Sequence, residues 1–177
     1  MNELERFGDI TAFCFDVDGV LTDSYVHVTE DGQLLRRMHV RDGYAIKRAI
    51  QEGYHVCIIT GGKSEGVAIR LRNLGVNFIY LGCRDKVAAY QEFRDVHELD
   101  DEQIMYVGDD LPDYEVMRLV GFPACPKDAC PEILQLATYI SGVEGGKGVA
   151  RDVIERVLRL RGDWLPDDEG EVLPTSV

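Results

Sequence analysis

Short apolar runs alternate along the chain with longer segments whose apolar residues recur at helical spacing. The short runs predict strands at residues 11–15, 55–60, 77–81, 104–107 and 122–124. Each run is continuous, as expected for strands that are buried on both faces. The helical pattern predicts helices at 43–52, 64–74, 86–96, 113–120, 131–136 and 149–160. This alternation favours an α/β fold: a doubly wound, Rossmann-like parallel sheet with helices on both faces.

The segment directly after the first predicted strand departs from this alternation. Residues 24–40 read as strand, turn and strand, with Asp31-Gly32 as a two-residue turn signal. We therefore expect a β-hairpin that projects from the sheet. Its apolar residues are more than a lone ribbon can bury. Two arrangements stay open: the hairpin folds back on its own domain, or it pairs with the hairpins of other subunits.

Composition adds mainly exclusions. The 177 residues carry 32 acidic and 19 basic side chains, a net charge of −13. Such a chain lacks the positive surface that nucleic acids and anionic membranes attract, so neither partner is expected. The length suits one domain, which we expect at residues 1–162. Residues 163–177 hold five acids and no base, and are expected to form an acidic, mobile tail.

Targeting signals are not evident in the sequence. The first residues lack the basic and apolar regions of a signal peptide. No apolar run approaches the roughly 18 residues of a membrane span. The five cysteines are therefore expected to be reduced thiols in the cytoplasm. Cys125 and Cys130 have no second pair and no nearby histidine, which argues against structural zinc.

Two carboxylates follow the first predicted strand, in the segment DVDGVLTD at 16–23. Asp16 would lie at the carboxyl end of a central strand, where open parallel sheets bind their ligands. Asp16 and Asp18 would be costly together without a cation, and Mg²⁺, which prefers oxygen ligands, would neutralise them. A turn with solvated acids is the alternative.

Two further signals follow later strands. In IITGGKS, at 58–64, Thr60 follows the apolar strand and precedes glycines and a helix. Its hydroxyl and the free backbone N–H groups could bind a phosphate, although ordinary strand-to-helix turns share this pattern. Lys86 opens a predicted helix, where its charge opposes the helix dipole. That placement suggests pairing with carboxylates and phosphate, the alternative being a surface lysine.

A fourth signal is GDDLPD at 108–113, directly after another apolar strand. Its acids would lie at the same edge of the sheet as Asp16, so Asp109 could complete a magnesium site. Asp113 could instead cap the next helix.

The four signals, at Asp16 and Asp18, at Thr60, at Lys86 and at Asp109, each lie near the end of a predicted strand. Their order along the chain resembles that of the motifs of the haloacid dehalogenase superfamily of phosphohydrolases. The resemblance implies that Asp16 is the nucleophile and forms an aspartyl phosphate. It implies that Asp18 is the general acid and then the general base. Mg²⁺ would be held by the carboxylates of Asp16 and Asp109 and by the backbone carbonyl of Asp18.

The resemblance also implies which residues bind the phosphoryl oxygens of the substrate. They would be held by Thr60, the amide of Gly61 and Lys86. Asp110 and Asp113 would orient Lys86 or metal-bound water.

The spacing of the motifs excludes a cap domain. Asp23 and Thr60 are separated only by the hairpin and one helix, and Thr60 and Lys86 only by one helix and one strand. A subunit without a cap must use a large ligand or a neighbouring subunit to exclude water from its site.

The chain is similar to a narrower, capless family, the 3-deoxy-D-manno-octulosonate (KDO) 8-phosphate phosphatases. The similarity lies in DVDGVLTD, in VRDGY at 40–44, in ITGGKSE, in GDDLPD and in GGKG at 145–148. It implies hydrolysis of KDO 8-phosphate to KDO and inorganic phosphate, a step toward the lipopolysaccharide inner core. It also implies a homotetramer assembled through hairpin 24–40, with the C-terminal segment reaching a neighbour's active site.

The same resemblance implies a set of contacts with the substrate: Asp18, His39, Val40, Arg41, Asp42, Gly43, Lys47, Arg70 and Lys86. A substrate with a carboxylate and a phosphate suits cationic partners. Arg41, Lys47 and Arg70 could instead be solvated charges on helix faces. Lys147, in the EGGKG loop, could reach a neighbour's site, or the loop could simply precede the last helix.

One position departs from the family pattern. Several KDO 8-phosphate phosphatases have arginine after Ile-Thr-Gly, whereas this chain has Gly62 followed by Lys63. A related phosphatase for a nine-carbon acid, 2-keto-3-deoxynononate 9-phosphate, has an acid there. Glycine cannot decide between the two substrates, and VRDGY together with Arg70 favours the eight-carbon one. A non-catalytic, oligomeric regulatory module is the alternative from another class of protein.

Overall fold

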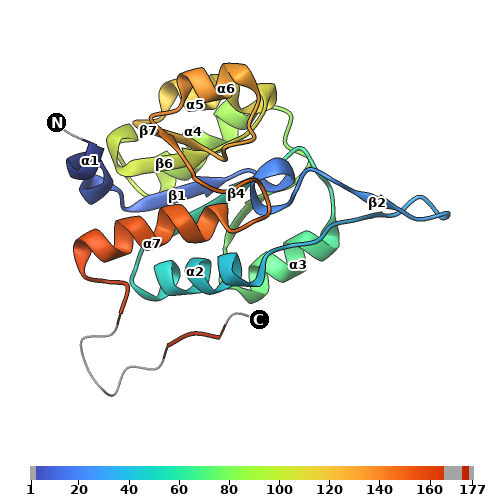
Figure 1. The fold of residues 1–177 in the computed structure, drawn as a ribbon, viewed down its shortest axis with the longest axis horizontal. Coiled ribbons are helices and arrows are strands. Elements are labelled where there is room, and N and C mark those ends of the chain that lie inside the picture. The colour runs from blue at the N-terminus through green and yellow to red at the C-terminus, as the bar shows by residue number, and fades with distance from the viewer. Residues whose placement is uncertain (1–2, 166–172, 176–177) are drawn as a thin grey trace.

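The computed structural model describes residues 3–165 and 173–175. Its centre is a parallel sheet of six strands in the order β5-β4-β1-β6-β7-β8 (Figure 1). The strands are β1 (Ala12–Phe15), β4 (His55–Ile59), β5 (Phe78–Tyr80), β6 (Ile104–Val107), β7 (Phe122–Cys125) and β8 (Tyr139–Ile140). All five adjacent pairs run parallel. The predicted doubly wound α/β fold is thus confirmed.

Helices cover both faces of the sheet (Figure 1). On one side lie α1 (Glu3–Asp9), α2 (Val40–Gln51), α3 (Glu65–Asn73) and α7 (Val149–Arg161). On the other lie α4 (Lys86–Val96), α5 (Tyr114–Leu119) and α6 (Pro131–Leu136). Three short helical turns complete the chain: η1 (Val17–Leu21), η2 (Asp101–Gln103) and η3 (Leu111–Asp113).

The side chains of β1 show why its sequence is a continuous apolar run. Phe13 and Phe15 are fully buried in the cluster that includes α2 and α7. Ala12 and Cys14 point the other way and are fully buried in the cluster that includes α4 and α5. Since successive strand residues face opposite sides, a strand covered on both sides must be apolar throughout.

Besides the three short helical turns, two elements were not predicted from the sequence, α1 and β8. α1 is largely polar, and Phe7 is its buried contact with the core. β8 has only two residues, too few to show a period.

The predicted start of the helix at Gly43 was wrong. α2 begins at Val40, so the end of the segment assigned to the hairpin is helical. Asp42 lies in the first turn, where an acid is favourable, and its Oδ1 accepts a hydrogen bond from Arg151 N of α7 at 2.7 Å. This contact between two helices could not be read from local sequence.

The hairpin projects from the sheet as predicted, but its strands are short. β2 (His27–Val28) pairs with β3 (Leu34–Leu35). The turn is longer than the predicted two residues, because Thr29 N donates to Gln33 O at 3.0 Å and closes a three-residue loop. Gly32 in that loop has a φ of +82°, a conformation that favours glycine.

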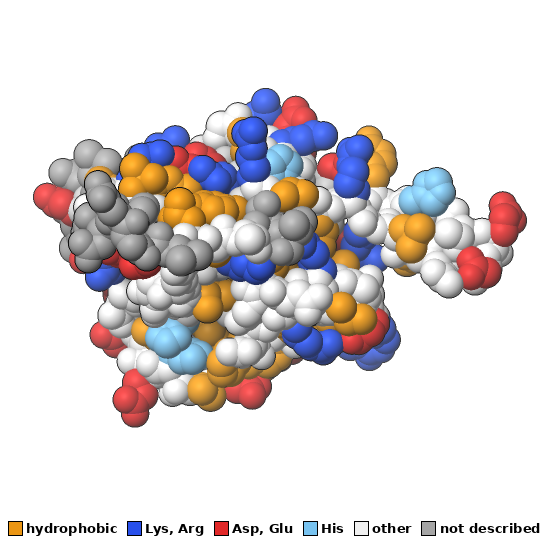
Figure 2. Space-filling view, turned by 90° about the horizontal axis from the view of Figure 1, so that it is seen from below, with side chains coloured by type: hydrophobic (Ala, Val, Ile, Leu, Met, Phe, Trp, Pro, Cys, Tyr) orange, Lys and Arg blue, Asp and Glu red, His pale blue; other side chains and the backbone are white. Residues whose placement is uncertain are grey.

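The hairpin does not fold back on its own domain. Tyr25 is 81% exposed, Val28 63% and Leu35 50%. Hydrophobic side chains are visible on the projecting segment in Figure 2. Apolar side chains exposed together on one projecting segment are typical of a contact site.

The first two residues after the predicted end of the domain contact its surface. Trp164 is buried, and Asp163 accepts hydrogen bonds from Tyr54 OH at 2.6 Å and from Arg48 Nε at 3.1 Å. These two residues therefore pack on the domain. Residues 166–172 and 176–177, most of the predicted mobile tail, lie outside the described residues. Within the described part of the chain, no helix is long and apolar enough to cross a membrane.

Candidate active site

The strands β1 and β6 end side by side where the strand order of the sheet reverses. From β1 the chain moves outward to β4 and β5, and from β6 it moves the other way to β7 and β8. Open parallel sheets bind ligands in the crevice outside the carboxyl ends of such strands. A cavity of about 430 Å³ lies at this edge, lined by Asp16, Asp18, Ser24, Thr60, Gly61, Gly62, Cys83, Arg84, Lys86, Asp109, Asp110 and Pro112.

The turn after β1 places Asp16 and Asp18 at this cavity. Asp16 has an extended backbone, and its Oδ1 accepts a hydrogen bond from Val17 N at 2.7 Å. Gly19 then takes a φ of +92°, and a Cβ at Gly19 would lie 1.9 Å from Asp109 Oδ2. Only glycine therefore lets this turn pass so close to Asp109.

The carboxylates of Asp16, Asp109 and Asp113 each have an oxygen within 4.8 Å of the others. Burial, and then the charge of Asp113, raises the pKa of Asp16 to about 7. Burial, and then the charges of Asp16 and Asp113, raises the pKa of Asp109 to about 8. Oδ1 of Asp109 is buried and accepts no hydrogen bond from any described residue. The cluster therefore holds acidic groups so close together that their ionisation is disfavoured, which a bound cation would offset.

Lys86 supplies a positive charge beside Asp16 and Asp113. It opens α4, as predicted, and its Nζ lies 3.1 Å from Asp16 Oδ1 and 2.7 Å from Asp113 Oδ1. Burial lowers the pKa of Lys86, but the carboxylates of Asp16 and Asp113 outweigh burial and the net shift is upward. Lys86 is therefore a charged group held against the carboxylate of Asp16.

Asp113 is a buried acceptor that orients its neighbours. Besides Lys86, it accepts hydrogen bonds from Tyr106 OH at 2.7 Å and from Asp109 N at 3.1 Å. It is the N-cap residue of α5 by position, as the alternative had it, but its side chain makes no capping hydrogen bond to that helix. Tyr106 was missed by sequence reasoning because it lies inside an apolar strand, where nothing distinguishes it from a core residue.

The acidic cluster fits a magnesium ion. Carboxylate oxygens are ligands that Mg²⁺ prefers, and Asp109 Oδ1 is a buried acceptor without a donor among the described residues. Asp113 lies close enough to be a third carboxylate ligand. The family resemblance had implied the backbone carbonyl of Asp18 as the third ligand. Because both oxygens of Asp113 already accept hydrogen bonds, Asp16 and Asp109 are the carboxylates left for a metal.

The loop after β4 brings Thr60 and Gly61 to the same cavity. The backbone of Thr60 is fixed on both sides, since its N–H donates to Tyr80 O at 3.0 Å and its carbonyl accepts from Cys83 N at 2.9 Å. Its hydroxyl oxygen accepts a hydrogen bond from Gly62 N at 3.1 Å. The hydroxyl of Thr60 is thus held at the edge where a phosphate could bind. Asp110, also at this cavity, accepts a hydrogen bond from Leu111 N at 2.8 Å.

Asp18 has a partner that the sequence did not predict, Arg36 of the hairpin. Arg36 Nε lies 2.7 Å from Asp18 Oδ1, and Nη2 lies 3.0 Å from Oδ2. The only sequence signal was a pair of arginines, Arg36 and Arg37, in a strongly acidic chain. Their direction depends on the hairpin's register and could not be inferred from the pattern. Arg84, another arginine at the cavity, was missed as well.

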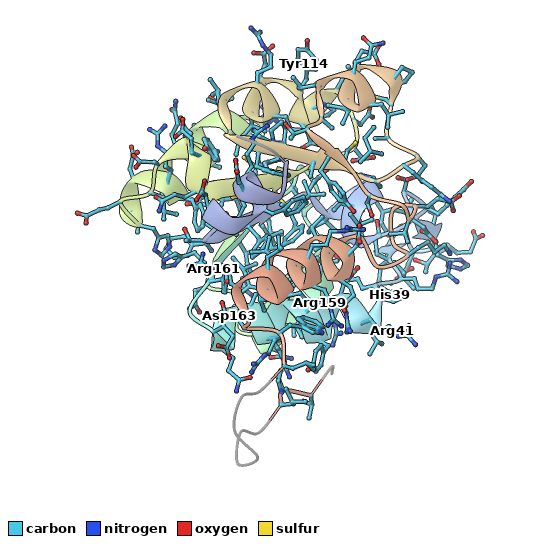
Figure 3. All side chains as sticks on the ribbon, turned by 60° about the vertical axis from the view of Figure 1, so that its left-hand side comes forward. His39, Arg41, Tyr114, Arg159, Arg161 and Asp163 are labelled. Carbon is cyan, nitrogen blue, oxygen red and sulfur yellow. The ribbon has the colours of Figure 1, made fainter. Side chains whose placement is uncertain are left out.

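The remaining predicted substrate contacts do not line this cavity, and they stay predictions. Figure 3 shows His39 and Arg41 at the start of α2, beside α7. Val40 and Arg70 line a separate hollow of about 560 Å³ between the hairpin and α3.

Two further members of that predicted set have other partners. Asp42 is 3% exposed and bound to α7, as described above. Lys47 Nζ donates to Thr175 Oγ1 at 3.3 Å.

The EGGKG loop is fixed to the catalytic turn of its own chain. Gly146 N donates to Val20 O at 2.9 Å, and Gly145 N donates to Asp128 Oδ1 at 2.8 Å. A Cβ at Gly145 would lie 2.0 Å from Gly19 O, so the close approach requires glycine. The loop therefore supports the turn that carries Asp18, and the reach of Lys147 toward a neighbour stays a prediction.

Comparison with known proteins identifies the family. The model of a family described as haloacid dehalogenase-like hydrolase matches residues 83–153. A curated relative, 3-deoxy-D-manno-octulosonate 8-phosphate phosphatase KdsC of Yersinia pestis, is 36% identical over 155 residues. These cover 88% of this chain and 83% of the relative.

Solved structures agree. The 3-deoxy-D-manno-octulosonate 8-phosphate phosphatase of Yersinia pestis superposes with a TM-score of 0.90 and 34% identity, covering 97% of this chain and 91% of that one. The enzyme of the same name from Moraxella catarrhalis, solved with magnesium, phosphate and KDO, gives a TM-score of 0.88 and 31% identity. That alignment covers 93% of this chain and 95% of the other. The chain therefore belongs to the KDO 8-phosphate phosphatase family of haloacid dehalogenase-like hydrolases.

Proposed function

We propose that the protein is a Mg²⁺-dependent phosphatase that hydrolyses KDO 8-phosphate to KDO and inorganic phosphate, a step toward the lipopolysaccharide inner core. One observation carries the proposal: the carboxylates of buried Asp16 and half-buried Asp109 lie close together at the sheet's crevice, with Lys86 bound to Asp16. A relative of the same fold binds magnesium, phosphate and KDO, which supports the choice of substrate. We expect the reaction in the cytoplasm, where the chain's thiols would stay reduced.

In the proposed reaction, Asp16 is the nucleophile. One of its oxygens attacks phosphorus, so a bond from Asp16 to the phosphoryl group forms as the bond to the sugar oxygen breaks. Asp18 gives a proton to the departing sugar oxygen, and then takes one from the water that releases phosphate. Thr60, the amide of Gly61 and Lys86 hold phosphoryl oxygens during both steps.

The metal would be held by the carboxylates of Asp16 and Asp109 and by the backbone carbonyl of Asp18. When bound, Mg²⁺ supplies charge that offsets the repulsion between these carboxylates and the phosphoryl group. Asp113 keeps Lys86 against Asp16 through its 2.7 Å ion pair, and Asp110 holds the start of the neighbouring turn.

A substrate panel tests the proposal. Phosphate release would be measured with Mg²⁺ for KDO 8-phosphate, 2-keto-3-deoxynononate 9-phosphate and hexose phosphates, with Asp16→Asn as the blank. We expect the highest kcat/KM for KDO 8-phosphate and none above background for Asp16→Asn, because the variant lacks the nucleophile. Preference for the nine-carbon acid would keep the mechanism and change the substrate. Wild-type activity in Asp16→Asn would exclude Asp16 as the nucleophile.

We also propose that the protein acts as a homotetramer assembled through hairpin 24–40. The support is the projecting hairpin with exposed Tyr25, Val28 and Leu35. In such an assembly, residues 39–43, Lys47 and Arg70 of one copy could meet the substrate of another. Light scattering after size exclusion should give a tetramer for the wild type and smaller species for Leu35→Glu. A monomeric wild type would exclude the assembly.

A further inference from the structure

Arg36 reaches from the hairpin into the catalytic cavity. Its side chain is only 7% exposed, although the strands beside it are exposed. Its guanidinium binds both oxygens of Asp18, at 2.7 and 3.0 Å, and its Nη1 donates to Leu34 O at 3.1 Å. A two-pronged contact of this kind fixes the orientation of a carboxylate as well as its position.

Gly62 leaves the space in which this contact forms. A Cβ at Gly62 would lie 3.4 Å from Arg36 Nη2, 3.4 Å from Thr60 Oγ1 and 3.5 Å from Asp18 Oδ2. Any longer side chain at position 62 would therefore enter the region between these three groups. Because all three groups surround the same position, the Arg36–Asp18 pair lies next to the Thr60 hydroxyl, which is proposed to hold phosphate.

Asp18 needs such a partner because little else holds it. Its side chain is 38% exposed, and its other described hydrogen bond is a long one, 3.4 Å from Thr22 Oγ1. A general acid is effective only when its proton lies within reach of the leaving oxygen. Of the two carboxylate oxygens, Oδ2 is the one on the side of Gly62 and Thr60.

We propose that Arg36 is a positioning residue that holds Asp18 for proton transfer, in the space that Gly62 leaves open. The inference rests on the proposed phosphatase reaction. When Asp18 acts as the acid, Oδ2 carries the proton in place of the hydrogen bond from Nη2, while Oδ1 stays on Arg36 Nε. Oδ2 passes that proton to the departing sugar oxygen, accepts from Nη2 again as a carboxylate oxygen, and later takes a proton from water. The hairpin thereby becomes part of the catalytic apparatus of its own subunit.

A double-variant comparison tests whether Arg36 acts through Asp18. We would measure kcat/KM for KDO 8-phosphate in wild type, Arg36→Gln, Asp18→Asn and the double variant. Misplacing a catalytic group costs about 10- to 100-fold, so we expect a loss of that order for Arg36→Gln. In the double variant the loss should equal that of Asp18→Asn alone, because nothing is left to position. Multiplying losses would show that Arg36 acts on substrate independently and would overturn the proposal.

A second substrate separates positioning from general damage. p-Nitrophenyl phosphate has a leaving group that needs little protonation, and kcat/KM reports steps only as far as its departure. Arg36→Gln should therefore lower kcat/KM much less for p-nitrophenyl phosphate than for KDO 8-phosphate. Arg36→Lys should recover part of the loss. Equal losses on both substrates, or none on either, would contradict the positioning role.

Arg37→Gln is the matched control. Arg37 is the next residue of the same hairpin and pairs with Asp23 at 2.8 Å, but its side chain is 78% exposed and outside the catalytic cavity. It should keep wild-type selectivity between the two substrates. If wild type turns over neither substrate, the proposed function fails. If wild type is active and Arg36→Gln matches Arg37→Gln, only the inference about Arg36 fails.

Discussion

At the scale of single residues, Gly19 decides how closely the two halves of the acidic site approach. Its φ of +92° is strained for any other residue, and a Cβ would overlap the carboxylate of Asp109. Gly19→Ala should cost about 1–3 kcal/mol of unfolding free energy for the backbone alone. It should also displace Asp109 and so reduce the rise in melting temperature that Mg²⁺ produces.

Gly53→Ala is the control for that variant. Gly53 has a φ of +85°, yet a Cβ there would have no neighbour within 4 Å. It should lose stability through its backbone but keep the full response to Mg²⁺. Thermal unfolding of both variants, with and without Mg²⁺, measures the difference. An undiminished Mg²⁺ response in Gly19→Ala would mean that Asp109 is not a ligand.

Sequence reasoning reached the residues that lie directly after strands. Asp16, Thr60 and Asp109 could be placed together because parallel strands end at one edge of the sheet. Arg36 could not, since its contact with Asp18 depends on how a hairpin with two-residue strands crosses that edge. Tyr106 could not either, because a buried hydroxyl has no signature in an apolar strand.

At the scale of elements, the contact between α2 and α7 contains a buried acid. Asp42 Oδ1 accepts from Arg151 N, whereas its Oδ2 is buried without a hydrogen bond from any described residue. Burial raises the pKa of Asp42 from 3.8 to about 7, against the opposing effect of Arg151. The folded state therefore holds a proton that the unfolded chain releases between these values. This contribution to stability is present below pH 4 and is lost as the pH rises toward 7.

Asp42→Asn should remove this dependence. The amide keeps an oxygen for Arg151 N and cannot ionise. Relative to Asp42→Asn, the wild type should therefore become less stable between pH 5.5 and 7.5. Urea unfolding of both proteins at the two pH values measures the change. A constant difference would show that Asp42 is ionised at both values.

The elements themselves were predictable in proportion to their length and burial. α4, β6 and α6 have the predicted bounds, since each begins and ends at a clear change of pattern. The start of α2 was missed because it is fixed by contact with α7, more than a hundred residues away. The hairpin's existence followed from its sequence, but its three-residue turn did not, because Gly32 alone fits several turn types.

At the scale of the whole molecule, the chain must bind an anion although its net charge is −13. The structure concentrates positive side chains where the chain needs them: Lys86 inside the cavity, Arg36 beside Asp18 and Arg84 at its lining. Even so, the carboxylates of Asp16 and Asp109 repel each other and any phosphate. The active form of the enzyme therefore requires a divalent cation.

The raised pKa values of Asp16 and Asp109 predict how this cation acts on stability. Without metal, both groups hold protons in the folded state up to about pH 7 and 8, well above their usual 3.8. In the metal-free protein, these two groups therefore stabilise the folded state at low pH. This contribution is lost as the pH rises through about 7 to 8. Mg²⁺ must displace the protons, so its stabilisation should be small at pH 6 and grow toward pH 8. Melting temperatures at both pH values, with and without Mg²⁺, test this, with Asp109→Asn expected to respond weakly at either. A larger Mg²⁺ effect at pH 6 would mean that the ion binds elsewhere on this acidic molecule.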